Sequence, residues 1–166
     1  MSHMFRLDMI MAILSVILGP ALLMFYFLDT CKRILRREFG HEFFHSVVNA
    51  NRLEFPFVRK ALEEFNAPVD YERFRMQLKC DFLALTYLLK NAGNAKGRLS
   101  KEERFLTWYF NAVVLKLIIT HWLRLSERAA VLRLTSILEY FANVLGERVD
   151  TIRFGDMTAS DYLMSL

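Results

Sequence analysis

The feature that most constrains this chain is an uncharged apolar run over residues 9–28, MIMAILSVILGPALLMFYFL. A helix of this length, with a rise of about 1.5 Å per residue, extends about 30 Å, the thickness of a bilayer's hydrocarbon core. No charged residue lies between Asp8 and Asp29. The Leu, Ile, Val and Phe side chains together favour membrane insertion by about 3–7 kcal/mol. The run therefore predicts a transmembrane helix.

Two other interpretations of this run fit less well. A core helix of a soluble domain needs a polar face, and here Ser15 and Tyr26 carry the only hydroxyl groups. A cleaved secretory signal has a shorter apolar region, a basic leader and small residues at its cleavage site. The leader here (residues 1–8) is not basic overall, and the run ends in bulky side chains, so a cleaved signal is not expected. Residues 2–4 resemble a cloning remnant and carry no argument.

Charge predicts the orientation of the span. Lys32, Arg33, Arg36 and Arg37 follow the run, whereas Arg6 and the terminal amine precede it. Because the more basic flank faces the cytoplasm, the N-terminus is expected outside and the rest of the chain in the cytoplasm. The membrane would be a bacterial inner membrane or an organellar equivalent. The four basic residues after the run are the predicted membrane-surface residues, which contact acidic headgroups.

The remainder of the chain predicts one all-α domain. The net charge of +4 is modest and no basic stripe continues past the membrane flank, so nucleic-acid binding is not expected. Gly and Pro are scarce, and apolar residues recur at intervals of three and four. We expect one N-terminal transmembrane helix followed by a compact bundle of about five helices over residues 51–166. The apolar C-terminal tail, from Glu147, is expected to dock on this domain or on a partner.

Residues 29–50 are predicted to form a basic amphipathic helix that continues from the membrane. Its apolar side chains recur every four residues, at Leu35, Phe39, Phe43 and Val47. The basic residues lie largely on the opposite side. This helix could lie on the lipid headgroups or pack on the domain, and the sequence leaves both possibilities open.

Capping signals place the helices of the domain. Asp70 is a good N-cap, Ser100 and Glu103 form a capping box, and Ser126 precedes the last long apolar pattern. Gly146 is a natural C′ residue at which that last helix would end. The expected helices span residues 57–65, 71–90, 101–125 and 127–145.

The segment 105–123 is apolar nearly all round, which raises the question of a second span. Lys116 falls near its middle, where it would cost about 2.5–3.5 kcal/mol in a membrane. We therefore favour a central core helix, with His121 as a core histidine, and leave the second span open. On the preceding helix, Asp81 is expected on the polar, solvated face.

A five-residue segment, His41-Glu42-Phe43-Phe44-His45, matches H-E-x-x-H and resembles the short motif of zinc metallopeptidases. On a helix, His41 and His45 would share one face and ligate Zn²⁺, and Glu42 would act as general base. A third ligand is missing at any familiar spacing. The candidates are Glu63, Glu64, Asp81 and His121. No strand is predicted that could hold a peptide substrate.

These patterns favour a binding function. The predicted protein is a membrane-anchored, non-catalytic accessory subunit that contacts the lipid bilayer and other subunits of a membrane complex, or further copies of itself. The C-terminal tail and the helix that carries Tyr109 and Trp122 would supply contact area. The alternative is a membrane-bound zinc-dependent hydrolase that uses Glu42 as the catalytic residue and His41 and His45 as metal ligands. No cofactor other than this alternative zinc is expected.

Overall fold

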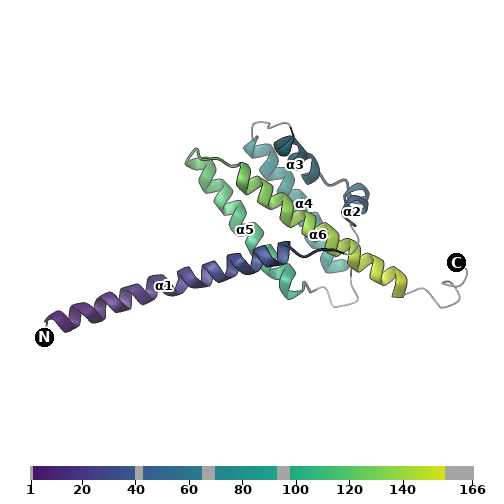
Figure 1. Ribbon diagram of the computed structural model, residues 1–166. Coiled ribbons are helices and arrows are strands. Elements are labelled where there is room, and N and C mark those ends of the chain that lie inside the picture. The colour runs from purple at the N-terminus through teal and green to yellow at the C-terminus, as the bar shows by residue number, and fades with distance from the viewer. Residues whose placement is uncertain (1, 40–42, 65–69, 93–97, 156–166) are drawn as a thin grey trace, which may run out of the picture. The chain divides into compact units, whose positions relative to one another are not determined.

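The computed structural model describes residues 2–39, 43–64, 70–92 and 98–155, with side chains left undescribed at 2–13, 15 and 151–155. Within these ranges the chain forms six α-helices and no strand, which confirms the predicted all-α class (Figure 1). The helices are α1 (Ser2–Leu35), α2 (Phe44–Asn51), α3 (Phe55–Glu63), α4 (Tyr71–Asn91), α5 (Lys101–Trp122) and α6 (Arg128–Gly155).

The chain divides into two compact units, Met1–Arg37 and Glu38–Leu166. Unit 1 contains α1, and the described part of unit 2 contains the five helices α2–α6, four of which (α3–α6) lie in the region 51–166 predicted to form the bundle. The division differs from the predicted helix over residues 29–50, which the structure does not form as one piece. Helix α1 ends at Leu35, and its last turn tightens because the amides of Arg36 and Arg37 bond to carbonyls three residues back.

The segment before α2 leaves the helical path because it packs against α6. The ring of Phe39 meets Tyr140 edge-on, with centroids 5.4 Å apart. The backbone N–H of Phe44 donates to Oδ1 of Asn143 at 2.9 Å, so a buried side chain of α6 holds the first turn of α2. These contacts join residues about one hundred positions apart. A local four-residue period cannot reveal such contacts, and it therefore predicted one continuous helix over residues 29–50.

Helix α6 is the core of unit 2. Each of α2, α3, α4 and α5 packs on it, and Figure 1 shows α6 between α5 on one side and α2 and α3 on the other. The stretch Arg128–Asp150 is long and apolar enough to cross a membrane, but most of it is buried inside unit 2. Apolar side chains that recur along α6 are buried: Ala130, Leu134, Ile137, Phe141 and Val144.

Gly146 does not end the last helix, so the prediction of a C′ stop there is wrong. Helix α6 continues to Gly155, and the residues expected to begin a docked tail, 147–155, form its last turns. The remaining predicted tail, residues 156–166, lies outside the described residues. Gly146 instead permits a close approach: a Cβ added there would lie 2.0 Å from Cβ of Phe43. The glycine therefore makes room for the segment that packs on α6.

The predicted caps of α4 and α5 are confirmed. The carboxylate of Asp70 accepts a hydrogen bond from the Arg73 amide at 3.3 Å, and Ser100 and Glu103 form both bonds of a capping box. Glu103 is also buried and pairs with Arg148 of α6. Arg148 donates a second hydrogen bond to the Leu89 carbonyl at 2.7 Å. One side chain thereby joins the end of α4 and the start of α5 to α6.

We expect Gly146→Ala to destabilise unit 2 by about 1–3 kcal/mol, because the new methyl group has no space beside Phe43. Helix propensity alone would predict a gain of about 1 kcal/mol. The thermal unfolding midpoint, followed by circular dichroism in one detergent, measures the change. In a Phe43→Gly background the same substitution should cost much less, since the clashing atoms are gone. A raised midpoint for Gly146→Ala in the parent chain would contradict the close packing.

Candidate interaction surfaces

The first surface is the apolar run on α1. Helix α1 covers all of residues 9–28 and continues through Pro20. Unit 1 holds no second helix that could cover these side chains. The large apolar side chains described in the run are exposed from Leu14 to Tyr26: Leu14, Val16, Ile17, Leu18, Leu22, Leu23, Met24, Phe25 and Tyr26. A helix that is apolar all round needs an apolar surrounding.

The second surface is the basic end of α1. Lys32 and Arg33 lie in its last turn, Arg36 and Arg37 follow it, and all four side chains are exposed. Nε of Arg33 lies 2.8 Å from Oδ2 of Asp29, one turn earlier. Cations at a helix C-terminus also interact favourably with the helix dipole. The predicted membrane-surface residues thus form one solvent-facing group at the end of the apolar run.

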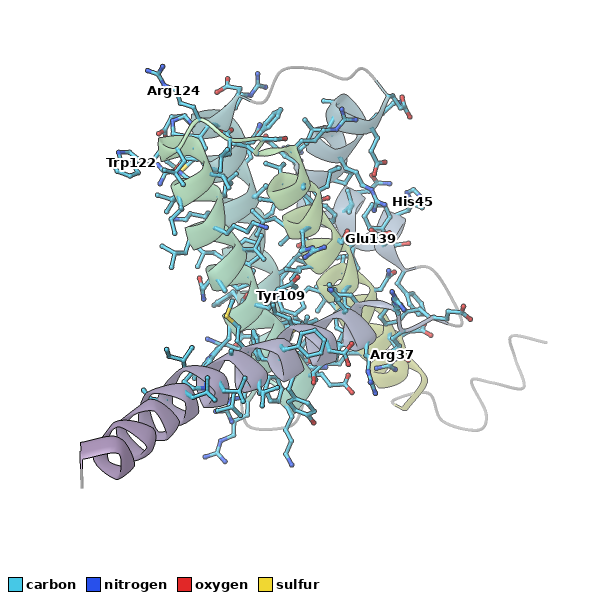
Figure 2. All side chains as sticks on the ribbon, turned by 60° about the vertical axis from the view of Figure 1, so that its left-hand side comes forward. Arg37, His45, Tyr109, Trp122, Arg124 and Glu139 are labelled. Carbon is cyan, nitrogen blue, oxygen red and sulfur yellow. The ribbon has the colours of Figure 1, made fainter. Side chains whose placement is uncertain are left out.

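The third surface is an exposed apolar stripe on α5. Its inner side packs in the core, as predicted for a core helix, whereas six outer positions recur at intervals of three and four residues. We call these residues the α5 stripe: Phe105, Trp108, Ala112, Leu115, Ile119 and Trp122. The indoles of Trp108 and Trp122 are 71% and 82% exposed, and Figure 2 shows Trp122 projecting from the end of α5. Tyr109 of the same helix is only 2% exposed and belongs to its inner side.

Most charges beside the α5 stripe are basic, although the exposed Glu102 lies one turn before its first residue, Phe105. From Arg104 to Ser126 the sequence contains no Asp or Glu, and its basic residues Arg104, Lys116 and Arg124 are all exposed. At the start of the helix, Lys101 and Arg104 line an open hollow of about 270 Å³ together with two stripe aromatics, Phe105 and Trp108. The α5 stripe is therefore apolar, aromatic at both ends and bordered by cations.

Helix α4 carries a second, shorter stripe, which we call the α4 stripe: Met76, Cys80, Leu83 and Tyr87, all exposed. The two helices are antiparallel neighbours, because Phe82 stacks on Phe110 at 3.8 Å and Tyr71 stacks on His121 at 3.7 Å. Exposed residues of both signs lie beside the α4 stripe: Glu72, Arg73, Lys79 and Lys90. The rim of the α4 stripe therefore carries both signs of charge.

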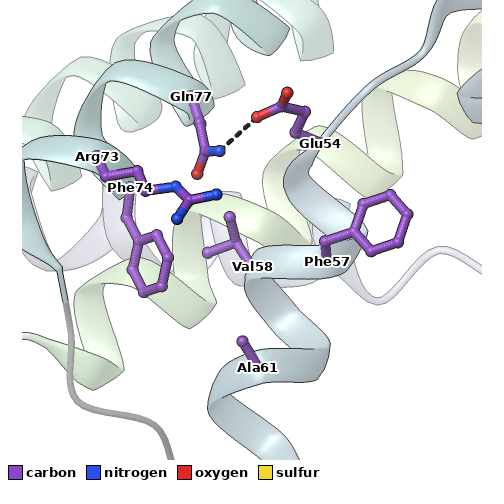
Figure 3. A pocket seen from close by; sticks show the side chains of 7 residues that line it. All are labelled: Glu54, Phe57, Val58, Ala61, Arg73, Phe74 and Gln77. Atoms are coloured by element: carbon purple, nitrogen blue, oxygen red, sulfur yellow. Dashed lines mark hydrogen bonds between the residues drawn. The ribbon is translucent and has the colours of Figure 1, made fainter.

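An open groove of about 410 Å³ lies between α3 and α4 (Figure 3). Seven described residues line it: Glu54, Phe57, Val58, Ala61, Arg73, Phe74 and Gln77. Nε2 of Gln77 donates a hydrogen bond to the Glu54 carboxylate, and the ring of Phe57 points away from the groove. None of the seven is a His, Cys or Ser, so these residues do not assemble a nucleophile or a metal site.

The zinc motif falls mostly outside the described residues. His41 and Glu42 are not among them, whereas His45 is the second residue of α2 and its side chain is exposed (Figure 2). The imidazole of His45 meets the ring of Phe44 edge-on at 4.9 Å. Among the described residues no three His, Cys, Asp or Glu side chains are grouped as a metal site requires. The zinc site therefore stays a prediction.

His121 is not the core histidine that we predicted, because its side chain is 51% exposed. The ring stacks on Tyr71, and Nδ1 lies 2.6 Å from Oε1 of Glu127. Just beyond it, Arg124 adopts a left-handed conformation with φ of 54°. The amide of Leu125 bonds to the Thr120 carbonyl at 2.8 Å, which completes a Schellman motif. The turn between α5 and α6 is thus fixed, with Arg124 projecting beside Trp122 (Figure 2).

Asp81 is buried, at 6% exposure, instead of lying on the solvated face of α4 as predicted. Its Oδ2 accepts hydrogen bonds from the amides of Glu54 and Phe55, at 2.9 and 2.7 Å, which are the first free N–H groups of α3. Burial raises the pKa of Asp81, and the two hydrogen bonds offset part of this rise. Asp81 therefore caps α3 from another helix.

No family model, curated protein or solved structure matches this chain. A likeness of fold thus gives no guide to what it does. Its function is inferred below from the surfaces just described.

We expect the stability advantage of the parent chain over Asp81→Asn to fall as pH rises above about 4. The amide keeps the acceptor oxygen but does not ionise. Because the pKa of Asp81 in the folded chain lies above its ordinary value of 3.8, protonation favours the folded state. That contribution is complete below 3.8 and is lost as pH rises through the folded pKa.

Thermal unfolding midpoints of both chains, measured at a series of pH values, check this expectation. The difference between the two midpoints isolates Asp81 from the other titrating groups. A difference that grows with rising pH would show that the hydrogen bonds to α3 outweigh burial.

Proposed function

We propose that this protein is a membrane-anchored accessory subunit that acts by binding. In this proposal α1 crosses the bilayer once through residues 9–28. The observation that carries it is the exposed, uncharged α1 run, which no other part of unit 1 covers. The transfer of such a surface into lipid is strongly favourable, and a span of this length matches the hydrocarbon core.

The basic end of α1 supports a defined orientation. With Lys32, Arg33, Arg36 and Arg37 on the cytoplasmic side, the N-terminus lies outside and unit 2 lies in the cytoplasm. The side chains are exposed and at the end of the apolar run, where they reach acidic headgroups.

The α4 stripe supports a protein partner for unit 2. Met and Tyr are common in protein interfaces, and an apolar centre with a charged rim of both signs is typical of such contacts. Anchoring by α1 would raise the effective concentration of unit 2 toward other subunits of a membrane complex. The partner is another subunit or a further copy of this chain.

Cysteine labelling tests the topology. Helix α4 carries the exposed Cys80, so a Cys31→Ala chain reports unit 2 through its one remaining native thiol. We expect a membrane-impermeant maleimide to label Cys80 only after the inner membrane is permeabilised. In a Cys31→Ala, Cys80→Ala, Ser2→Cys chain, the N-terminal thiol should react in intact spheroplasts. Labelling of Cys80 from outside, or a chain that stays soluble and monomeric without detergent, would overturn the anchored topology.

Purification in mild detergent tests the accessory role. We expect companion polypeptides at a fixed ratio, or a homo-oligomer, and we expect Leu83→Glu to remove them because it places a charge in the α4 stripe. Phe57→Glu is the matched control, since Phe57 is 74% exposed, as Leu83 is 67%, but lies on α3. A parent chain that purifies alone as a monomer would contradict the accessory role. Equal loss in both variants would exclude a specific role of the α4 stripe.

A further inference from the structure

The α5 stripe is a surface that the anchored topology alone does not explain. Its six side chains run along α5 on the side away from the core of unit 2. From Phe105 to Trp122 it extends about 26 Å at the rise of an α-helix. An apolar surface of this kind, bordered by polar residues, marks a contact with a partner or a membrane.

The basic residues beside the α5 stripe indicate that its partner is anionic. Arg104, Lys116 and Arg124 border the stripe, and no acidic residue occurs between positions 104 and 126. A surface that is apolar along its centre and cationic along its edges complements an anionic phospholipid layer.

The aromatic residues at the two ends of the stripe are of the kind found at a lipid interface. At one end Trp108 and Phe105 share a hollow with Lys101 and Arg104. At the other end Trp122 lies two residues before Arg124. Indole rings favour the headgroup region, where the ring is partly apolar and its N–H finds a hydrogen-bond partner. On a helix that lies flat, Ala112, Leu115 and Ile119 would lie at the same depth as the tryptophans, at the boundary between headgroups and acyl chains.

The packing of α5 decides its orientation. Leu106, Phe110, Val113 and Leu117 are buried in the core of unit 2 on the opposite side of the helix. Only the outer side of α5 is available to lipid, as in a helix that lies in the plane of the interface. A second span would need an apolar surrounding for Lys116 as well, and this residue is exposed at the edge of the stripe.

A second copy of α5 fits the stripe less well. If two α5 stripes paired with each other, most of the cations along both edges would meet like charges, because each copy offers an acidic residue only at its start, Glu102. Anionic lipid neutralises the same cations.

We infer that the α5 stripe is a second membrane-contact site, which lies flat on the surface of an anionic phospholipid bilayer. The inference rests on the proposed anchoring by α1, which keeps unit 2 close to the membrane. Contact through α5 would fix one face of unit 2 toward the lipid and leave its other exposed surfaces for partners.

The two tryptophans of the chain provide a direct test, because both belong to the stripe. The full chain is reconstituted into vesicles of phosphatidylcholine alone, or of phosphatidylcholine and phosphatidylglycerol in equal parts. Tryptophan emission is then quenched either by brominated acyl chains or by aqueous acrylamide. We expect severalfold stronger quenching by brominated lipid, and weaker quenching by acrylamide, in the vesicles that contain phosphatidylglycerol.

Charge variants test the same site without removing its fluorophores. Lys116→Glu should reduce quenching by brominated lipid severalfold in the anionic vesicles. Lys60→Glu is the matched control, since Lys60 is an exposed lysine on α3, which does not pack on α5. It should leave the quenching unchanged, and circular dichroism verifies that both variants stay folded.

Each remaining outcome overturns the inference. Full quenching by acrylamide with none by brominated lipid would show that the stripe faces water. Protection from both quenchers would show that protein, such as a second copy, covers it. Flotation of the vesicles after alkaline extraction reports the α1 anchor separately. A chain that no longer floats with the vesicles contradicts the proposed function. A chain that floats with them, but whose tryptophans brominated lipid does not quench, contradicts only the α5 contact.

Discussion

The burial of α6 is the interaction on which unit 2 depends. Four helices pack on its apolar surface, and burial of apolar area is the main favourable term in folding. Polar side chains of α6 then fix where those helices lie: Asn143 holds the start of α2, and Arg148 holds the ends of α4 and α5. Because α6 uses one side of each neighbour, the other sides of α4 and α5 remain exposed. The candidate surfaces are thus a direct result of how the core is built.

The two exposed stripes differ in length and in their aromatic residues. Apolar area alone does not distinguish a lipid surface from a protein partner, since both accept Leu, Ile and aromatic residues. Each stripe has basic residues along its length and one exposed acidic residue at its start, Glu72 or Glu102. The α5 stripe is the longer one and carries both tryptophans of the chain, which suits a lipid interface. In the proposed function, α1 and these surfaces would join a bilayer to another protein.

Features encoded locally could be predicted from the sequence, and features that depend on distant residues could not. The Asp70 cap and the Ser100–Glu103 capping box act within one turn, and both were predicted correctly. Asp81 binds amides of another helix, and Gly146 accommodates Phe43 from far along the chain, so neither role has a local signal. The outer side of α5 was partly visible in its nearly continuous apolar pattern. Which of its residues face outward, Trp108 and not Tyr109, required the packing on α6.

At the end of α5, Arg124 has a left-handed backbone conformation and a positively charged side chain. Its left-handed φ of 54° is one that glycine adopts freely and that costs an L-residue about 1–2 kcal/mol. A glycine would relax this turn, but it would also leave the last tryptophan without a neighbouring cation. The chain thus tolerates backbone strain at Arg124, an exposed residue that follows the end of α5. Strain of this kind is common at sites where recognition, more than folding, dictates the residue.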